Sequence, residues 1–272
     1  MPSWKDPPAD KSVDCEDLTE EDTGEEPELE YDNYVTDPED CHIEGSVTPE
    51  VTESYGPCGG QIIKIWKFEE DCAKATNPND RKMEHVQIIT VNYSDNPEWV
   101  EPPADLELGC VAGLEYIEDG PQELSYENHA EGDVDGCRVS GTATGYICAA
   151  VGYCSGMITQ TWTADDECRR VIDHTQIVTT TAATQASWVN PPPSQGMTCT
   201  QAYLTTLQPL SAFRLQYKNN LRGPCKIEGY MEPRIEVNVQ NCTGTITRTW
   251  EFTDLCLRTI THVQVLTVTP DV

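Results

Sequence analysis

The chain has few basic residues and few large apolar side chains. It carries 17 Lys and Arg against 47 Asp and Glu, which gives a net charge of −30, and it has only 3 Phe. Such an excess of negative charge repels nucleic acids and anionic membrane surfaces. No stretch approaches the roughly 20 apolar residues of a membrane helix. The sequence therefore predicts neither nucleic-acid binding nor a membrane span.

Motifs that mark catalysis and metal binding are also missing. The sequence has no H-E-x-x-H, no G-x-S-x-G, no P-loop and no C-x-x-C pair. It opens without the apolar core of a signal peptide, so we interpret it as a processed product or a segment of a longer chain. We predict a protein that is not an enzyme.

What the sequence does contain is one phrase written three times. A Trp is followed three residues later by Pro-Pro and eleven residues later by Cys, at Trp4, Trp99 and Trp188. Three further cysteines follow each first one, with gaps of 26, 17 and 14 residues in the first and third repeats and 27, 17 and 14 in the second. A period near 90 residues predicts three domains in series, at 1–97, 98–187 and 188–272.

The 13 cysteines divide into four per repeat and one remainder, Cys148. Regularly spaced, even numbers of cysteines in small modules indicate disulfides and an oxidising compartment, here extracellular or at the cell surface. Cys148 is expected to be a small buried apolar residue, with an intermolecular disulfide as the alternative.

Strand signals dominate each repeat. The shared phrases Leu-x-Tyr-x-Asn, Cys-x-(Ile/Val)-x-Gly, Cys-x-Gly-x-Ile-x-x-x-Trp and His-x-Gln-(Ile/Val)-x-Thr are rich in β-branched and alternating residues. No segment reads as an amphipathic helix. We predict an all-β chain of three tandem immunoglobulin-like β-sandwiches, each with two disulfides.

The pairing of the cysteines can be argued from strand geometry. The third and fourth cysteines are separated by an extended strand of roughly 30 Å, so they cannot bond to each other. In such a sandwich the first and last strands run the same way and the penultimate strand runs opposite. The first cysteine ends the opening strand, so it lies at the pole of the third cysteine, which leaves the second for the fourth. The predicted disulfides are Cys15–Cys58, Cys41–Cys72, Cys110–Cys154, Cys137–Cys168, Cys199–Cys242 and Cys225–Cys256.

These phrases resemble the immunoglobulin-like, hyalin-repeat-related modules of bacterial secreted adhesins and gliding-motility-associated surface proteins. The segments that carry the resemblance are 103–110, 156–168 and 244–256, and the likeness extends over nearly the whole chain. The family usually has Gly-Asn after the fourth cysteine, whereas this chain has Ala73-Lys74, Arg169-Arg170 and Leu257-Arg258. The resemblance implies a fold and an extracellular setting, and its motifs are structural.

Acidic residues raise a calcium hypothesis. Carboxylates precede each fourth cysteine and follow two of the Pro-Pro pairs, and the predicted topology brings both sets to one pole, where oxygen ligands would suit Ca²⁺. The alternative is an ordinary solvated acidic surface. The candidate calcium ligands are Asp10, Glu70, Asp105, Asp166 and Asp254.

The acidic segment 16–40 is predicted to be a mobile loop.

Two further kinds of site follow from the sequence. N-x-S/T sequons make Asn92 and Asn241 candidate glycosylation sites. The short Trp-x-x-Pro-Pro linkers predict that Trp4, Trp99 and Trp188 pack between neighbouring domains. Trp4 would then meet a domain of another copy or of an upstream stretch of the same precursor.

The charge is distributed unevenly. Residues 1–97 carry 25 acids and 7 bases, 98–187 carry 16 and 3, and 188–272 carry 6 and 7. We therefore expect copies of the chain, or continuing repeats, to join head to tail in a surface filament. One alternative is a segment of an adhesin that binds glycan or protein and is stiffened by calcium. A weaker one is an acidic matrix protein that binds calcium or mineral.

Overall fold

The computed structural model describes residues 2–36, 42–69, 82–128 and 135–271. Contacts divide the chain into two compact units. The first unit holds Met1–Pro102, Glu123–Thr144 and Trp162–His174. The second unit holds Pro103–Gln122, Gly145–Thr161 and Thr175–Val272. Each unit thus combines one outer repeat with part of the middle repeat, so each contains one junction between consecutive repeats.

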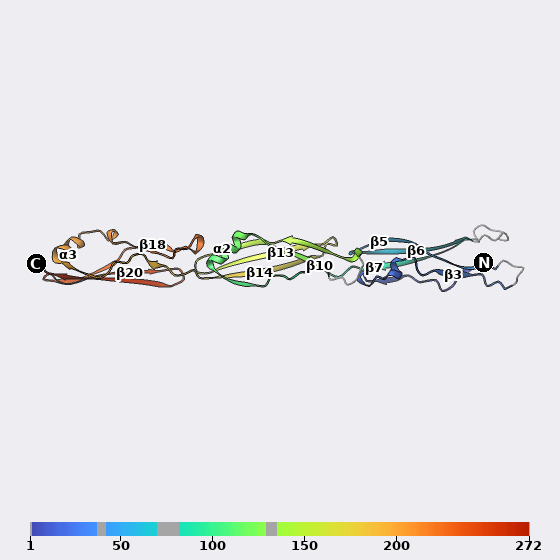
Figure 1. Ribbon diagram of the computed structural model, residues 1–272, viewed down its shortest axis with the longest axis horizontal. Coiled ribbons are helices and arrows are strands. Elements are labelled where there is room, and N and C mark those ends of the chain that lie inside the picture. The colour runs from blue at the N-terminus through green and yellow to red at the C-terminus, as the bar shows by residue number, and fades with distance from the viewer. Residues whose placement is uncertain (1, 37–41, 70–81, 129–134, 272) are drawn as a thin grey trace. The chain divides into compact units, whose positions relative to one another are not determined.

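The predicted all-β class is confirmed. Each repeat contributes one three-stranded and one four-stranded sheet. The strands of each sheet come from a single repeat, except that β15 begins at Ser187, one residue before the predicted start of the third repeat. In the first repeat the strand orders are β1-β3-β4 and β2-β7-β6-β5. Figure 1 labels β3, β5, β6 and β7 of this repeat. Its elements are β1 Ser3–Trp4, β2 Lys11–Val13, η1 Cys15–Asp17, α1 Glu20–Thr23, β3 Leu29–Asp32, β4 Glu44–Val47, β5 Glu50–Gly56, β6 Gly59–Glu69 and β7 Lys82–Val91.

The other two repeats follow the same plan, with sheets β8-β10-β11 and β9-β14-β13-β12, then β15-β17-β18 and β16-β21-β20-β19. The middle repeat has β8 Glu98–Trp99, β9 Leu106–Gly109, α2 Cys110–Asp119, β10 Glu123–Glu127, η3 Asp135–Cys137, β11 Ser140–Thr144, β12 Tyr146–Val151, β13 Gly156–Asp165 and β14 Val171–Thr181. The last has β15 Ser187–Trp188, β16 Gln195–Thr198, α3 Cys199–Thr206, η4 Leu210–Phe213, β17 Leu215–Lys218, η5 Gly223–Cys225, β18 Glu228–Met231, β19 Arg234–Gln240, β20 Thr243–Thr253 and β21 Thr259–Thr269.

The strand before the first cysteine runs parallel to the last strand of its repeat. β2, β9 and β16 pair in parallel with β7, β14 and β21. The penultimate strands β6 and β20 run antiparallel to β7 and β21. This is the arrangement that the pairing argument assumed, and it places the first and third cysteines at the same pole of a sandwich.

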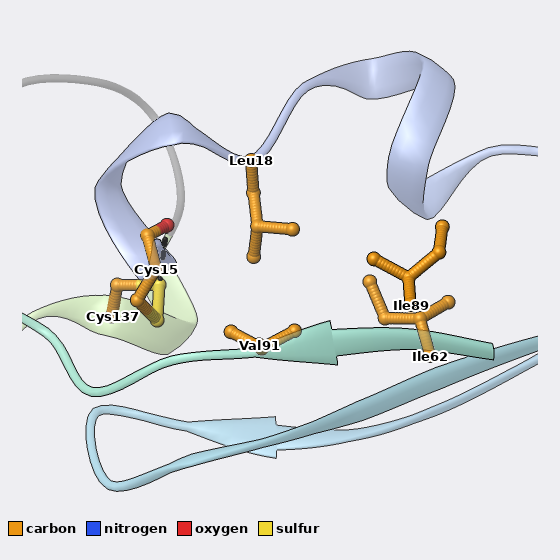
Figure 2. Packing of buried hydrophobic residues seen from close by; sticks show 6 residues of the cluster. All are labelled: Cys15, Leu18, Ile62, Ile89, Val91 and Cys137. Carbon is orange, nitrogen blue, oxygen red and sulfur yellow. Dashed lines mark hydrogen bonds between the residues drawn. A yellow bond between two sulfur atoms is a disulfide. The ribbon is translucent and has the colours of Figure 1, made fainter. Parts of the chain in front are cut away.

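The core of each repeat is centred on its long penultimate strand. Trp66, Trp162 and Trp250 are at most 1% exposed, because alternate residues of β6, β13 and β20 face inward. In the first repeat, Figure 2 shows Leu18 and Cys15 on the segment that crosses over the sheet, facing Ile62, Ile89 and Val91. Apolar burial from both sides therefore holds this segment on the sheet.

The shared phrases have structural roles. The His of His-x-Gln packs on the core Trp, and its Nε2 lies 2.8–2.9 Å from a Pro-Pro carbonyl at His85 and His262. The next Gln donates to the following carbonyl, as Gln264 does to Pro193 at 2.9 Å. These contacts bind the opening segment of a repeat to its last strand. The recurrence of His is therefore explained by packing.

Two sequence expectations about local structure are wrong. Helices α2 and α3 begin at the first cysteines of their repeats, Cys110 and Cys199, although the sequence predicts no helix. Helix α2 contains Gly113, whose missing side chain leaves room for Thr180. The segment 16–40, predicted to be a loop, contains regular structure in its described part, 16–36, where η1, α1 and β3 lie. Helix α1 lies there with a capping box in which Thr19 and Asp22 bond reciprocally, and Asp22 is buried and paired with Lys11.

Candidate functional site: the junctions between repeats

The disulfides join consecutive repeats. Four of the five in the described part of the chain bond a cysteine of one repeat to a cysteine of the next, and the fifth lies within the last repeat. The first cysteine of a repeat bonds to the second of the next, and the third bonds to the fourth. The five bonds are Cys15–Cys137, Cys58–Cys168, Cys110–Cys225, Cys154–Cys256 and Cys199–Cys242.

This corrects most of the predicted pairing. Of the predicted disulfides, Cys199–Cys242 is confirmed, and Cys41–Cys72 lies outside the described residues. The structure contradicts four: Cys15–Cys58, Cys110–Cys154, Cys137–Cys168 and Cys225–Cys256.

The physical reason lies in which ends of the repeats meet. The first cysteine does lie near the third, since the Cys110 sulfur is 3.5 Å from the carbonyl of Gly152, two residues before Cys154. The second and fourth cysteines of the next repeat approach the same place. Four sulfurs therefore gather at each junction, and each bond forms across it. Strand geometry predicts which cysteines lie at the same end of one sandwich. It does not predict which cysteines of neighbouring sandwiches come into contact.

An Arg closes the first junction beside its disulfides. Arg170 follows Cys168 by two residues, and its Nε donates to the carboxylate of Asp166 at 2.6 Å. Its Nη1 donates to the carbonyls of Ser94 and Asp95 in the preceding linker at 2.5 and 3.0 Å. The Asp166 side chain is fully buried and that of Arg170 is 14% exposed, so water competes little with this clamp.

The second junction repeats the clamp. Arg258 Nε donates to Asp254 at 2.8 Å, and Arg258 Nη1 donates to the carbonyl of Ala183 at 2.6 Å. Ala183 stands 89 residues after Ser94, and Asp254 and Arg258 stand 88 after Asp166 and Arg170, so the two junctions use equivalent positions. The same local pattern, Asp-x-Cys-x-Arg, therefore builds both interfaces.

The carboxylates of both clamps are held in their charged form. Burial raises the pKa of Asp166 and of Asp254, but the amide and guanidinium of the following Arg outweigh this effect. The amide of Cys168 or Cys256 adds a further hydrogen bond of 2.9 Å. The net pKa of each carboxyl is lowered from 3.8. The clamps are therefore fully charged at neutral pH.

Apolar and ionic contacts complete the second junction. Cys110, Cys225 and Ala183 form a buried cluster, and Leu114 of α2 packs against it. Nearby, Arg222 of the last repeat makes a two-pronged pair with Glu118 of the middle repeat, both distances being 2.8 Å. This pair is half exposed, so water and salt screen it, and it serves orientation more than strength.

The structure gives the calcium candidates other partners. Asp10 and Asp105 accept the backbone N–H of Ile88 and Ile177 at 2.8 Å, and the Ser194 hydroxyl takes the equivalent place in the last repeat. Asp166 and Asp254 belong to the Arg clamps. Glu70 lies outside the described residues. No group of three or more His, Cys, Asp or Glu in the described ranges is arranged to hold a metal ion.

The Trp residues that recur in the linkers contact their own repeats. Trp4, Trp99 and Trp188 meet Tyr31, Tyr126 and Tyr217 edge to face at 5.7–6.0 Å. Each Trp sits in a two-residue strand paired with the strand that carries this Tyr. The Tyr in turn lies over the Gly of Cys-x-(Ile/Val)-x-Gly, where a side chain would collide with it. These contacts anchor each Trp within its own sandwich.

The remaining sequence candidates lie on the surface or beside a junction. Asn92 is exposed and donates to Asp14 at 2.7 Å, while Ser94 of its sequon is buried in the first junction. Asn241 is exposed next to Cys242. Cys148 is a free, exposed thiol on β12, at the edge of its sheet, so the expectation that it is buried is wrong.

Sequence reasoning missed the two clamping Arg residues. The signal was present, because Asp-x-Cys-x-Arg recurs at Asp166–Arg170 and Asp254–Arg258. The sequence alone favours a departure from a turn motif at Arg169-Arg170 and Leu257-Arg258 and a calcium ligand at Asp166 and Asp254.

In the described residues, no helix has the length and apolarity to cross a membrane. The disulfides indicate folding in an oxidising compartment.

Comparison with known proteins adds little to this picture. No protein-family model matches the chain, and no curated protein matches it. Among solved structures, the chain is weakly similar to the M60 catalytic domain with the CBM51-1 and CBM51-2 domains from Clostridium perfringens ZmpB. The identity is 8% and the TM-score 0.21, and the match covers 100% of this chain and 31% of that one. The chain thus spans about a third of that protein's length. Because the TM-score is so low, we draw no conclusion about fold or function from this similarity.

Proposed function

We propose that this chain is a non-enzymatic structural repeat protein, a subunit or segment of an extracellular filament built head to tail. The observation that carries the proposal is the way in which consecutive repeats are joined. Two disulfides and one Arg clamp connect each repeat to the next, so the connection does not depend on the linker alone.

Such a junction suits a protein under tension. A force that parts two ordinary tandem domains straightens the linker and breaks non-covalent contacts. Here the separation of two repeats within a unit requires the breaking of two S–S bonds. Two points of covalent attachment also prevent rotation about a single linker.

Long-range cross-links also stabilise small sandwiches. On the chain-entropy model, a bond that closes a loop of 102–122 residues contributes about 5 kcal/mol, against about 4 kcal/mol for the 43-residue loop of Cys199–Cys242. Each repeat has few large apolar residues, so these bonds add stability that a small core supplies only in part.

Electron microscopy of the native material and of the purified oxidised chain tests the proposal. Filaments with a regular axial repeat, lost after reduction, would support it. Particles that stay single, together with selective binding on a glycan array, would refute it in favour of an adhesin segment. A polar hollow of about 360 Å³, lined by Lys5, Glu30, Glu44, Gly45 and Ser46, is where substitutions would then test glycan binding.

A further inference from the structure

Each junction contains one buried and one half-buried disulfide. The four cysteines of the buried bonds are at most 3% exposed, whereas the four cysteines of the other bonds keep part of their surface in contact with water. Because a thiolate must reach a sulfur atom in order to break an S–S bond, a half-buried disulfide is open to thiol exchange and a buried one is closed to it. The buried bonds are Cys15–Cys137 and Cys110–Cys225, and the half-buried bonds are Cys58–Cys168 and Cys154–Cys256.

The buried bonds belong to apolar clusters. Figure 2 shows the Cys15–Cys137 bond close to Leu18 and Val91, which are members of the same buried cluster. The equivalent bond of the second junction, at Cys110, lies in a cluster of the same kind. A thiol can reach these sulfurs only after the packed interior of the junction has opened.

The half-buried bonds lie at surface turns. Cys256 stands between Leu255 and Leu257, whose side chains are 81% and 85% exposed. The residues on either side of Cys168 are exposed as well. A small thiol therefore approaches both fourth cysteines from the water without displacing packed side chains.

Each half-buried bond also closes a ring around the linker between two repeats. In the second junction the amide of Ala183 donates to the carbonyl of Tyr153, the residue before Cys154, at 2.7 Å. The carbonyl of Ala183 accepts from Arg258, two residues after Cys256, at 2.6 Å. The linker is thus held on both sides of one residue, and the S–S bond joins the two groups that hold it. We call this arrangement the linker clasp.

The first junction has the same linker clasp. The amide of Ser94 donates to the carbonyl of Pro57 at 2.9 Å, and Pro57 precedes Cys58. The carbonyl of Ser94 accepts from Arg170 at 2.5 Å, and Arg170 follows Cys168 by two residues. The clasp is therefore built from the same positions of the repeat at both junctions.

The loss of a half-buried bond would loosen a junction without dividing it. The linker, the buried disulfide and the half-buried disulfide make three covalent connections between two repeats. Three connections that do not lie in one line fix the orientation of two bodies, whereas two connections leave rotation about the line that joins them. The opened clasp would keep only its hydrogen bonds, and the buried disulfide would still hold the repeats together.

We propose that Cys58–Cys168 and Cys154–Cys256 are redox-sensitive latches, which a thiol of low molecular weight opens to turn a rigid junction into a hinged one. The buried disulfides stay closed in this step. The inference goes beyond the proposed function, because it concerns the stiffness of a junction within a single chain and does not require a filament. The Arg of each clasp is then a positioning residue, which keeps the turn of the fourth cysteine in place for the bond to form again.

The step is a thiol–disulfide exchange in which the thiol is oxidised and the latch is reduced. In the second junction a thiolate attacks the Sγ of Cys256, forms a mixed disulfide and releases the thiolate of Cys154. A second thiolate attacks the sulfur of the first thiol, forms the oxidised thiol dimer and releases the thiolate of Cys256. The two protein thiolates take up the protons that the two thiols have lost. The reverse reaction with the oxidised dimer closes the latch.

The first test follows each cysteine of the oxidised full-length chain. The free thiol of Cys148 is blocked with iodoacetamide, and the protein is titrated with reduced glutathione at a fixed concentration of oxidised glutathione. New thiols are trapped with N-ethylmaleimide and located by peptide mapping. We expect the cysteines of both latches to be labelled at glutathione concentrations that leave the buried bonds intact. Labelling of the buried bonds together with the latches, or before them, would overturn the inference.

The fifth disulfide is an internal standard for access. Cys199 and Cys242 are half-buried, and their bond crosses no junction. It should open in the same range of glutathione as the latches, which would support burial as the cause of the order. Resistance of this bond equal to that of the buried bonds would count against that cause.

The second test measures the hinge. In the double variant Cys154→Ser with Cys256→Ser the second latch is permanently open, and hydrogen exchange reports on the linker amides. The amide of Ala183 should exchange faster than in the parent, while the amide of Ser94 in the intact first clasp is the matched control and should not change. Equal exchange at Ala183 in variant and parent would overturn the hinge.

The third test concerns the positioning role of Arg258. Without its guanidinium the turn of Cys256 is held less firmly, so the reduced latch should close less readily. In Arg258→Met we expect Cys154–Cys256 to open at about tenfold lower glutathione, the effect of one lost hydrogen bond to a charged group. The midpoint of Cys58–Cys168 should stay where it is. An equal shift at both latches, or no shift at either, would contradict the positioning role.

Discussion

The clamp at the second junction makes a sharp prediction about stability. In the variant Arg258→Met the aliphatic part of the side chain is kept and the guanidinium is removed. The carbonyl of Ala183, in a residue 4% exposed, loses its donor at 2.6 Å, and the carboxylate of Asp254 loses its ionic partner at 2.8 Å. A lost hydrogen bond to a charged group costs about 1.5–3 kcal/mol, and the breaking of a buried ion pair costs about 3–5 kcal/mol.

The expected cost is smaller than the sum of these values. The Arg258 side chain is 26% exposed, and the amides of Cys256 and residue 258 still stabilise the Asp254 carboxylate at 2.9 Å. We expect a loss of about 2–3 kcal/mol, or a fall of roughly 5–10 °C in Tm. Calorimetry on the oxidised chain measures it. The matched control is Arg234→Met, whose side chain is 81% exposed and should change stability by less than about 0.5 kcal/mol.

The pH dependence checks the same reasoning independently. Because the folded pKa of Asp254 lies below 3.8, its charged form contributes stability that is present above that pH and is lost as the pH falls through the folded pKa. Without Arg258 the carboxyl pKa rises toward its ordinary value. The difference in Tm between the variant and the parent should therefore be full at pH 7 and shrink below about pH 4. Equal stability of the two Met variants at pH 7, or a difference that is constant with pH, would refute the clamp.

Three other substitutions test interactions in the second unit. Asn219→Ala removes donors to the carbonyls of Thr184 and Cys225 and should cost about 2–4 kcal/mol by urea denaturation, whereas the exposed Asn238→Ala should be nearly neutral. Tyr116→Phe removes the hydroxyl that lies 2.7 Å from the Gln176 side chain in the core and should lower stability by about 1–3 kcal/mol; no change in the urea midpoint would contradict this. Gly229→Ala would place a Cβ in collision with the Tyr217 hydroxyl and should cost about 1–3 kcal/mol, with altered near-ultraviolet circular dichroism; an unchanged spectrum would show that the ring has room to move.

Much of one repeat could be predicted from its residues. The alternation of apolar residues and the many β-branched residues predict the strands. The fixed spacing between Trp, Pro-Pro and Cys predicts the three repeats. The expectation that the opening and closing strands run in the same direction is also confirmed, as in β16 and β21. These features depend on local conformational preferences and on contacts within one sandwich. The alternation of side chains between the two faces of a strand shows both in the sequence. The helices α2 and α3 were missed because they are short and follow a cysteine, where a strand was expected to end in a turn.

The sequence alone determined that the chain is all-β, that it contains three similar modules, and that its sulfurs gather at the poles of each sandwich. Only the tertiary structure decided which sulfurs bond. At a junction four cysteines lie together, and the choice between Cys110–Cys154 and Cys110–Cys225 depends on how two sandwiches meet. Spacing along the chain is the same in either case, because the choice is made by contacts between residues 102–122 positions apart. The role of Arg170 and Arg258 was decided in the same way, since each reaches a carbonyl in the linker that precedes its own repeat.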